Sequence, residues 1–192
     1  IIINVTEAKP TSVIESKGQY VVLSKTGKII EIDKEKKYSV PTVLGAELEN
    51  VKLSSTVKYK DKNVKKYVDD ILAAVGETGI KNIETVDISN LSKITLIRKN
   101  GFKIIIGTPE NVEYKLKTAK AIMDGNVKDS DSTGILDVSL ASADGGKSYL
   151  KDGAAAESSL QSSKPENSSA ESSKPEESKT EESSQESSSE ET

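Results

Sequence analysis

The sequence contains no cysteine, histidine or tryptophan, and aromatic residues make up only 4% of its 192 positions. Without cysteine there is no disulfide framework, thiolate nucleophile or cysteine-ligated zinc, and without histidine there is no Ser-His-Asp triad or histidine-bearing metal site. One phenylalanine and six tyrosines are too few for the stacked aromatic platform that binds single-stranded nucleic acid. We therefore expect no metal, no cofactor and no nucleic-acid partner.

Long apolar runs are also missing. The longest run, residues 71–75, has five residues, whereas a helix needs about 20 to cross a bilayer and a secretory signal needs about 7–15. The chain starts with three isoleucines, and its only methionine is Met123. We expect a fragment that begins within a strand, so the missing signals say nothing about the parent protein.

Acidic residues are concentrated at the C-terminal end. Residues 154–192 contain 14 Ser, 10 Glu and 3 Lys, a net charge of −7, which leaves +3 for the rest of the chain. The unit Ser-Ser-Lys-Pro-Glu occurs at 162–166 and again at 172–176. Such a segment buries too little apolar surface to offset the entropy of ordering it, so we expect a disordered tail, either a solvated spacer or a linker without a role.

The remainder is rich in strand-forming residues, since valine and isoleucine supply about half of the apolar side chains. Apolar runs bounded by turn residues predict a series of strands, several of them in hairpins. The expected strands are residues 1–6, 12–16, 19–24, 29–33, 83–89, 93–99, 102–107 and 135–140, with weaker candidates at 50–57 and 149–150.

Two helices are expected between these strands. In the first, apolar residues from Val64 to Val75 recur at helical spacing, with Asp61 as the N-cap and Gly76 as the end. In the second, Thr108 is the expected cap, Pro109 the first helical residue, and Gly125 the end. The order of elements predicts an α+β fold, a mostly antiparallel sheet with two helices packed on it.

Motifs that carry chemistry are weak. Residues 129–134 resemble the start of a calcium loop, but Leu140 stands where a bidentate glutamate is needed. Residues 146–148 match only the end of a phosphate-binding loop. Asp69 and Asp70 are neighbours on the first helix, so they point about 100° apart and are expected on its solvated face. The residues thus show no active site.

Four landmarks occur in a fixed order: a strand ending in Pro10, a hairpin, a Val-Pro segment and a late Leu-Asp-Val-Ser strand. They are residues 3–10, 20–29, 40–45 and 136–139. Their order resembles the extracytoplasmic part of the bacterial cell-division family FtsQ, which is called DivIB in Gram-positive bacteria.

The resemblance implies a particular domain organisation. Residues 1–9 would be the last strand of a truncated POTRA domain, residues 10–153 an FtsQ/DivIB-type β-domain, and residues 154–192 the tail. In this family a membrane helix, absent from this sequence, precedes the POTRA domain. The expected location is therefore the extracytoplasmic side of the cell membrane, at the division septum.

The resemblance also implies a scaffold rather than an enzyme. FtsQ-like proteins bind the membrane-anchored proteins FtsB and FtsL (DivIC and FtsL in Gram-positive bacteria), and a partner segment adds as a strand near the last strands of the β-domain. Carried onto this chain, a free backbone rim is expected close to Val138. The implied partner-binding residues are Leu136, Val138, Ser139, Leu140, Ser142 and Tyr149.

Other interpretations remain open. Residues 135–140 could form an ordinary core strand without a partner. The chain could also be a secreted adhesion or cell-wall-binding module on a Ser/Glu-rich stalk. A hydrolase that uses only carboxylates has little support, because its catalytic pair would have to come from distant positions.

Overall fold

The computed structural model describes residues 7–127 and 134–152. The chain divides into two compact units, Ile1–Ser162 and Ser163–Thr192, and every described residue belongs to the first. The strand expected at residues 1–6, the calcium-like residues 129–133 and the tail expected from residue 154 lie outside the described residues. None of the described helices is long and apolar enough to cross a membrane.

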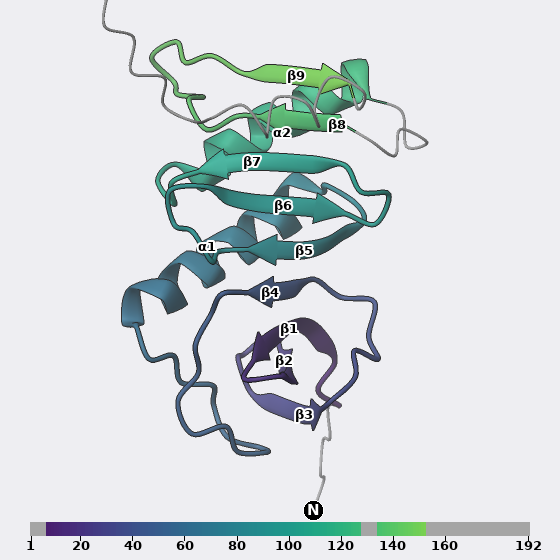
Figure 1. Cartoon of the computed structure of the whole chain (residues 1–192), viewed down its shortest axis with the longest axis vertical. Coiled ribbons are helices and arrows are strands. Elements are labelled where there is room, and N and C mark those ends of the chain that lie inside the picture. Colours follow the sequence, from purple (N-terminus) through teal and green to yellow (C-terminus); the bar gives the residue numbers. More distant parts are fainter. Residues whose placement is uncertain (1–6, 128–133, 153–192) are drawn as a thin grey trace, which may run out of the picture. The chain divides into compact units, whose positions relative to one another are not determined.

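The described residues form one nine-stranded sheet with two helices, an α+β architecture as the sequence predicts (Figure 1). The strand order is β3-β2-β1-β4-β5-β6-β7-β8-β9. The strands are β1 (Pro10–Ser16), β2 (Gln19–Ser24), β3 (Ile29–Asp33), β4 (Thr42–Leu44), β5 (Ile83–Asp87), β6 (Ile94–Arg98), β7 (Lys103–Gly107), β8 (Gly134–Asp137) and β9 (Tyr149–Asp152).

Most neighbours in the sheet are antiparallel hairpin partners, but β4 differs. It pairs in parallel with β1 through Val13↔Thr42 and with β5 through Thr42↔Thr85, and so joins the N-terminal hairpins to the rest of the sheet. Strand β4 is not predicted by the sequence patterns, which indicate a weak strand at residues 50–57 instead. That segment makes only an isolated bridge, Lys28↔Thr56, so the expectation of a strand there is wrong.

Helix α1 (Lys62–Thr78) begins as expected and ends later than expected. The Asn63 amide donates to Asp61 Oδ1 at 2.7 Å, so Asp61 is the N-cap. The helix continues through Gly76 and ends at Gly79, whose φ of 65° is left-handed. Gly76 therefore lies inside the helix, and the predicted end was wrong by about one turn.

Helix α2 (Val112–Asn126) starts after Asn111, which has φ 54°, rather than at Thr108 and Pro109. The expected cap has another role, because the Thr108 carbonyl accepts a hydrogen bond of 3.0 Å from Lys115 Nζ. Lys115 is buried, and burial lowers the pKa of its amine. Nor does Gly125 end the helix, which closes one residue later.

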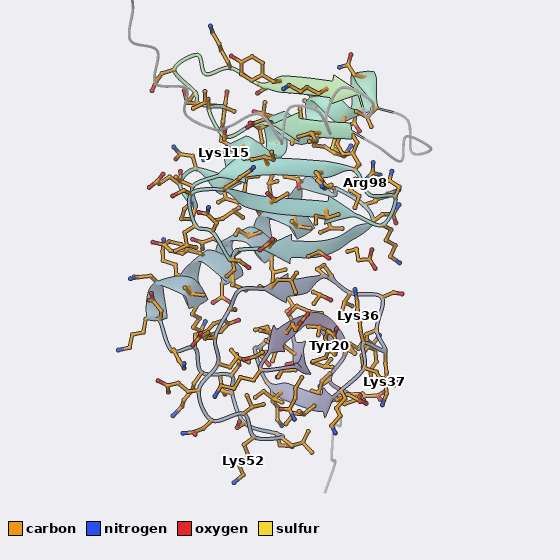
Figure 2. All side chains as sticks on the ribbon, viewed as in Figure 1. Tyr20, Lys36, Lys37, Lys52, Arg98 and Lys115 are labelled. Atoms are coloured by element: carbon orange, nitrogen blue, oxygen red, sulfur yellow. The ribbon has the colours of Figure 1, made fainter. Side chains whose placement is uncertain are left out.

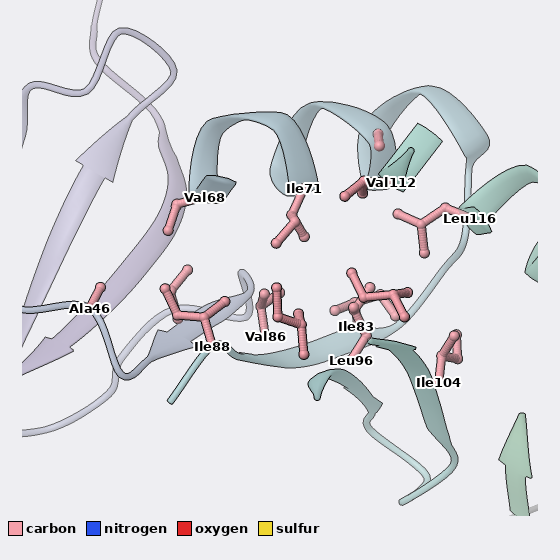
Figure 3. Close-up of a cluster of buried hydrophobic side chains, with 14 of the residues drawn as sticks. Ala46, Val68, Ile71, Ile83, Val86, Ile88, Leu96, Ile104, Val112 and Leu116 are labelled. Atoms are coloured by element: carbon pink, nitrogen blue, oxygen red, sulfur yellow. The ribbon is translucent and has the colours of Figure 1, made fainter. Parts of the chain in front are cut away.

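Both helices pack on one face of the sheet, where the core lies. Val68 and Ile71 of α1 and Leu116 of α2 face Val86 and Leu96 of the central strands (Figure 3). These side chains are at most 1% exposed. Alternate residues of the same strands point to the opposite face, which no described helix covers. The sequence-predicted layering is therefore confirmed.

Candidate partner-binding edge

Strand β8 carries the implied partner site, and both of its sides are occupied. It pairs in parallel with β7 through Ile104↔Leu136 and antiparallel with β9 through Leu136↔Leu150. The expected free rim near Val138 is therefore wrong. Residues 149–152 pair with residues 134–137, and the Val138 backbone is bonded to Ile105 and Ala141. The strand also ends at Asp137 and does not extend to Leu140 as expected.

The outer strand at this end of the sheet is β9. Among residues 7–127 and 134–152, no strand pairs with its outer side. Tyr149 is 50% exposed and Leu150 is 37% exposed. A strand in this position presents unpaired backbone donors and acceptors together with apolar side chains, which is the usual surface for adding a further strand.

The register of β9 determines which of its side chains lie on the helix-covered face of the sheet and which lie on the opposite face. Leu150 pairs with Leu136, which belongs to the core under the helices, so Leu150 extends the helix-covered face. Tyr149 pairs with Asp137 and Lys151 with Ile135, so both lie on the opposite face. A strand added to β9 would therefore meet an apolar side chain on one face and an aromatic and a cationic side chain on the other.

A compact turn follows β8 and holds Leu140 beside this edge. The Ser139 amide donates to Asp137 Oδ1 at 2.9 Å, and the Ala141 amide donates to the Val138 carbonyl at 3.0 Å. Leu140 is 64% exposed on this turn. A Cβ built on Gly146 would lie 1.7 Å from the Leu140 carbonyl oxygen, so only glycine lets the returning chain pass so close.

At the opposite edge of the sheet, residues 54–57 bond to residues 27–29 and so cover the start of β3. The Ile29 amide donates to the Ser55 carbonyl at 2.8 Å, and the Ser54 amide donates to the Ile29 carbonyl at 2.9 Å. Further along, Tyr38 and Lys37 hydrogen-bond to Glu31. The segment expected to be a weak strand thus shields the start of β3, whereas no described strand pairs with the outer side of β9.

The six implied site residues differ in what they offer a partner. Leu136 and Val138 are fully buried, Ser139 and Ser142 are half-buried, and only Leu140 and Tyr149 are well exposed. Leu150 and Lys151 belong to the same edge and were missed as site residues. The sequence feature that points to them is the short strand after the Gly145-Gly146 turn. This strand was expected to begin at Tyr149, but it was not identified as the outermost strand of the sheet.

The other motifs of the sequence can be compared with the described residues one by one. No cluster of three or more acidic side chains there could hold a metal ion. The segment 146–148 leads into β9 rather than a helix, which does not fit a phosphate-binding loop. Asp69 and Asp70 are exposed and pair with Lys65 and Lys66, as expected for a solvated helix face.

Comparison with known proteins gives a consistent family. The sequence matches the family described as cell division protein FtsQ/DivIB, C-terminal, over residues 13–139. A cell division protein DivIB from Clostridium botulinum is 31% identical over 124 residues, which are 64% of this chain and 48% of that protein. The chain thus spans about half the length of this relative.

A solved structure also aligns with the chain. It is the major extracytoplasmic domain of the trans isomer of the bacterial cell division protein DivIB from Geobacillus stearothermophilus. The two chains are 15% identical with a TM-score of 0.39, and the alignment covers 64% of this chain and 99% of that one.

Proposed function

Since the chain belongs to the FtsQ/DivIB family of non-enzymatic cell-division proteins, we propose that it is a divisome scaffold that captures other division proteins along the outer edge of β9. The proposed partners are membrane proteins of the FtsB and FtsL type, DivIC and FtsL in Gram-positive bacteria. A segment of one of them would add to β9 as a tenth strand next to the nine described.

The proposed setting follows from the family. Residues 10–153 would act on the extracytoplasmic side of the cell membrane at the division septum. Residues 1–9 would belong to a preceding POTRA domain, and residues 154–192 would form a tail. The match to the family over residues 13–139 supports this organisation.

One observation carries the proposal, the difference between the two edges of the sheet. Proteins normally shield exposed edges, because an unpaired row of amides and carbonyls invites other chains to pair. Here residues 54–57 shield the start of β3, while β9 presents Tyr149 and Leu150 at an unpaired side within the described residues. An edge that is left open while the other is shielded is suited to a partner.

A pair of proline variants tests this edge. Amides of neighbouring residues in a strand point in opposite directions, so one of Leu150 and Lys151 directs its N–H toward β8 and the other directs its N–H outward. Leu150→Pro and Lys151→Pro each remove one donor. The proline variant that keeps the wild-type melting temperature is the one that has lost the outward amide. We expect this variant to bind the extracytoplasmic segment of DivIC or FtsL about tenfold more weakly than the wild type does.

The matched controls are Leu150→Ala and Lys151→Ala, which keep both amides. Each alanine variant should bind more tightly than the proline variant at the same position. If the proline variant with unchanged melting temperature binds its partner as tightly as the wild type, the strand-addition mode is wrong.

A further inference from the structure

A second surface lies at the end of the sheet where β6 ends and β7 begins. Lys36 and Lys37, from the loop after β3, and Lys99, from the β6–β7 turn, line a groove of about 440 Å³. The Lys99 amide donates to the Asn82 carbonyl at 2.8 Å, which brings Lys81 next to the same turn. Figure 2 shows Lys36, Lys37 and Arg98 on this side of the molecule.

The register extends the positive charge across the sheet. Lys103 pairs with Ile135 of β8, which in turn pairs with Lys151 of β9. Lys103 and Lys151 therefore share the face without helices and stand two strands apart, about 10 Å at the usual strand spacing. We call Lys81, Lys99, Lys103 and Lys151 the lysine row.

Ion pairs distinguish the lysine row from the other lysines of this surface. Lys36 lies 3.6 Å from Glu84, and Lys37 pairs with Glu31 and Asp33. In contrast, no ion pair joins any member of the lysine row to another described residue. All four side chains are exposed, so their charges are accessible to an anionic ligand.

The kind of cation indicates the kind of ligand. Arg98 is the only arginine in the chain; it is 3% exposed, and its Nε donates to the Lys81 carbonyl at 3.3 Å. The accessible cations are therefore all lysines, compact point charges without the planar fork that pairs with a carboxylate. Separate lysine charges spread over a surface can each pair with a different anionic group. They are therefore better suited to a flexible polymer with many anionic groups than to one small ligand.

We propose that the lysine row, with the adjoining groove, binds a linear phosphodiester polyanion, such as a polymer of glycerol phosphate. Each phosphodiester carries one negative charge, and a flexible polymer can place successive phosphates on lysines of neighbouring strands. The scarcity of exposed aromatic side chains leaves no stacking platform for bases, so we favour this ligand over a nucleic acid. Binding would release counterions and weaken with salt.

The test uses the full chain and synthetic, fluorescently labelled poly(glycerol phosphate), with the dissociation constant measured by anisotropy at several salt concentrations. The triple variant Lys81→Gln/Lys99→Gln/Lys103→Gln removes three charges and leaves β9 intact. We expect its dissociation constant to rise about tenfold or more and its salt dependence to become less steep.

The matched control is Lys25→Gln/Lys52→Gln/Lys58→Gln, which removes the same charge from exposed lysines elsewhere; Lys52 is labelled in Figure 2. This control should keep most of the wild-type affinity. Equal weakening in both triple variants would show a response to net charge only and would overturn the site. A poly(glutamate) probe of equal charge that binds as tightly would overturn the phosphodiester assignment.

Discussion

At the scale of single residues, two glycines show how α1 ends. Gly79 has φ 65° and closes the helix, whereas Gly76 has helical neighbours on both sides and no heavy atom within 4 Å of a built Cβ. A left-handed angle is costly for any residue with a Cβ, and glycine in a helix interior is less stable than alanine. The same residue type therefore has opposite effects three positions apart.

Alanine substitutions should distinguish the effects of Gly76 and Gly79 on stability. Gly76→Ala should raise the free energy of unfolding by about 1 kcal/mol, because alanine is the better helix former and has room here. Gly79→Ala should lower it by about 1 kcal/mol, because the left-handed angle resists a Cβ. Urea unfolding measures both. A loss of stability in Gly76→Ala would instead mean that the helix ends there, as the sequence alone predicted.

A hydrogen-bonded carboxylate beside β3 gives a prediction that depends on pH. The Tyr38 hydroxyl donates to Glu31 Oε2 at 2.5 Å, and Lys37 Nζ lies 3.1 Å from Glu31 Oε1. These hydrogen bonds, first that from Tyr38, lower the pKa of Glu31 from its ordinary value of 4.5. Their stabilisation is present above the pKa of Glu31 in the unfolded chain and is lost as pH falls through the folded value.

Tyr38→Phe should therefore be less stable than the wild type at neutral pH, and the difference should shrink as the solution is acidified below the ordinary glutamate pKa of 4.5. Thermal unfolding at a series of pH values measures this. Tyr114→Phe is the control, because no hydrogen bond joins its hydroxyl to a described carboxylate. A stability difference for Tyr38→Phe that stays constant with pH would exclude the role assigned to Glu31.

At the scale of secondary-structure elements, β4 is the strand that unites the sheet. Thr42 is 4% exposed, pairs with β1 on one side and β5 on the other, and its Oγ1 has no hydrogen-bond partner among the described residues. A buried hydroxyl without a partner lowers stability, because it has lost its hydrogen bonds to water.

Thr42→Val should consequently raise the free energy of unfolding, by about 1 kcal/mol. Thr85→Val on β5 changes the residue opposite Thr42 and is the control, since Thr85 is only half-buried and should respond less. Chemical denaturation measures the free energy of unfolding of both variants. A Thr42→Val variant less stable than the wild type would show that the hydroxyl has a partner after all.

The elements also show what the sequence could predict. Hairpins formed by β1, β2 and β3 follow from local patterns, namely β-branched runs separated by glycine turns. Strands β2 and β3 have the expected bounds. Strand β4 was missed because it has three residues and pairs only in parallel with distant strands, which leaves no local signature. Asp61 was identified as a cap because capping depends on adjacent residues alone.

The partner edge was harder to predict for the same reason. Residues 136–139 were recognised as a late strand of the family, but whether a strand is outermost depends on what the remaining chain pairs with. Leu150 pairs with Leu136 and takes over the edge, which no pattern within residues 135–140 could reveal. The sequence thus led to the right end of the sheet and to the wrong strand.

At the scale of the whole described fold, the two proposed surfaces are separate in their chemistry. The edge of β9 offers backbone groups with Tyr149 and Leu150, and the lysine row offers charge from the strand ends. Capture by β9 should depend weakly on salt, because backbone hydrogen bonds and apolar contacts dominate it, whereas polyanion binding should depend on salt strongly. Only Lys151 belongs to both.

Hydrogen exchange of the backbone amides in Tyr149–Asp152 tests strand addition most directly. It is measured with and without a bound extracytoplasmic segment of DivIC or FtsL. The outward amides of β9 should exchange rapidly in the free protein and at least about tenfold more slowly in the complex, while amides of β3 keep their rates. A complex that forms without slowing any amide of β9 would contradict the account.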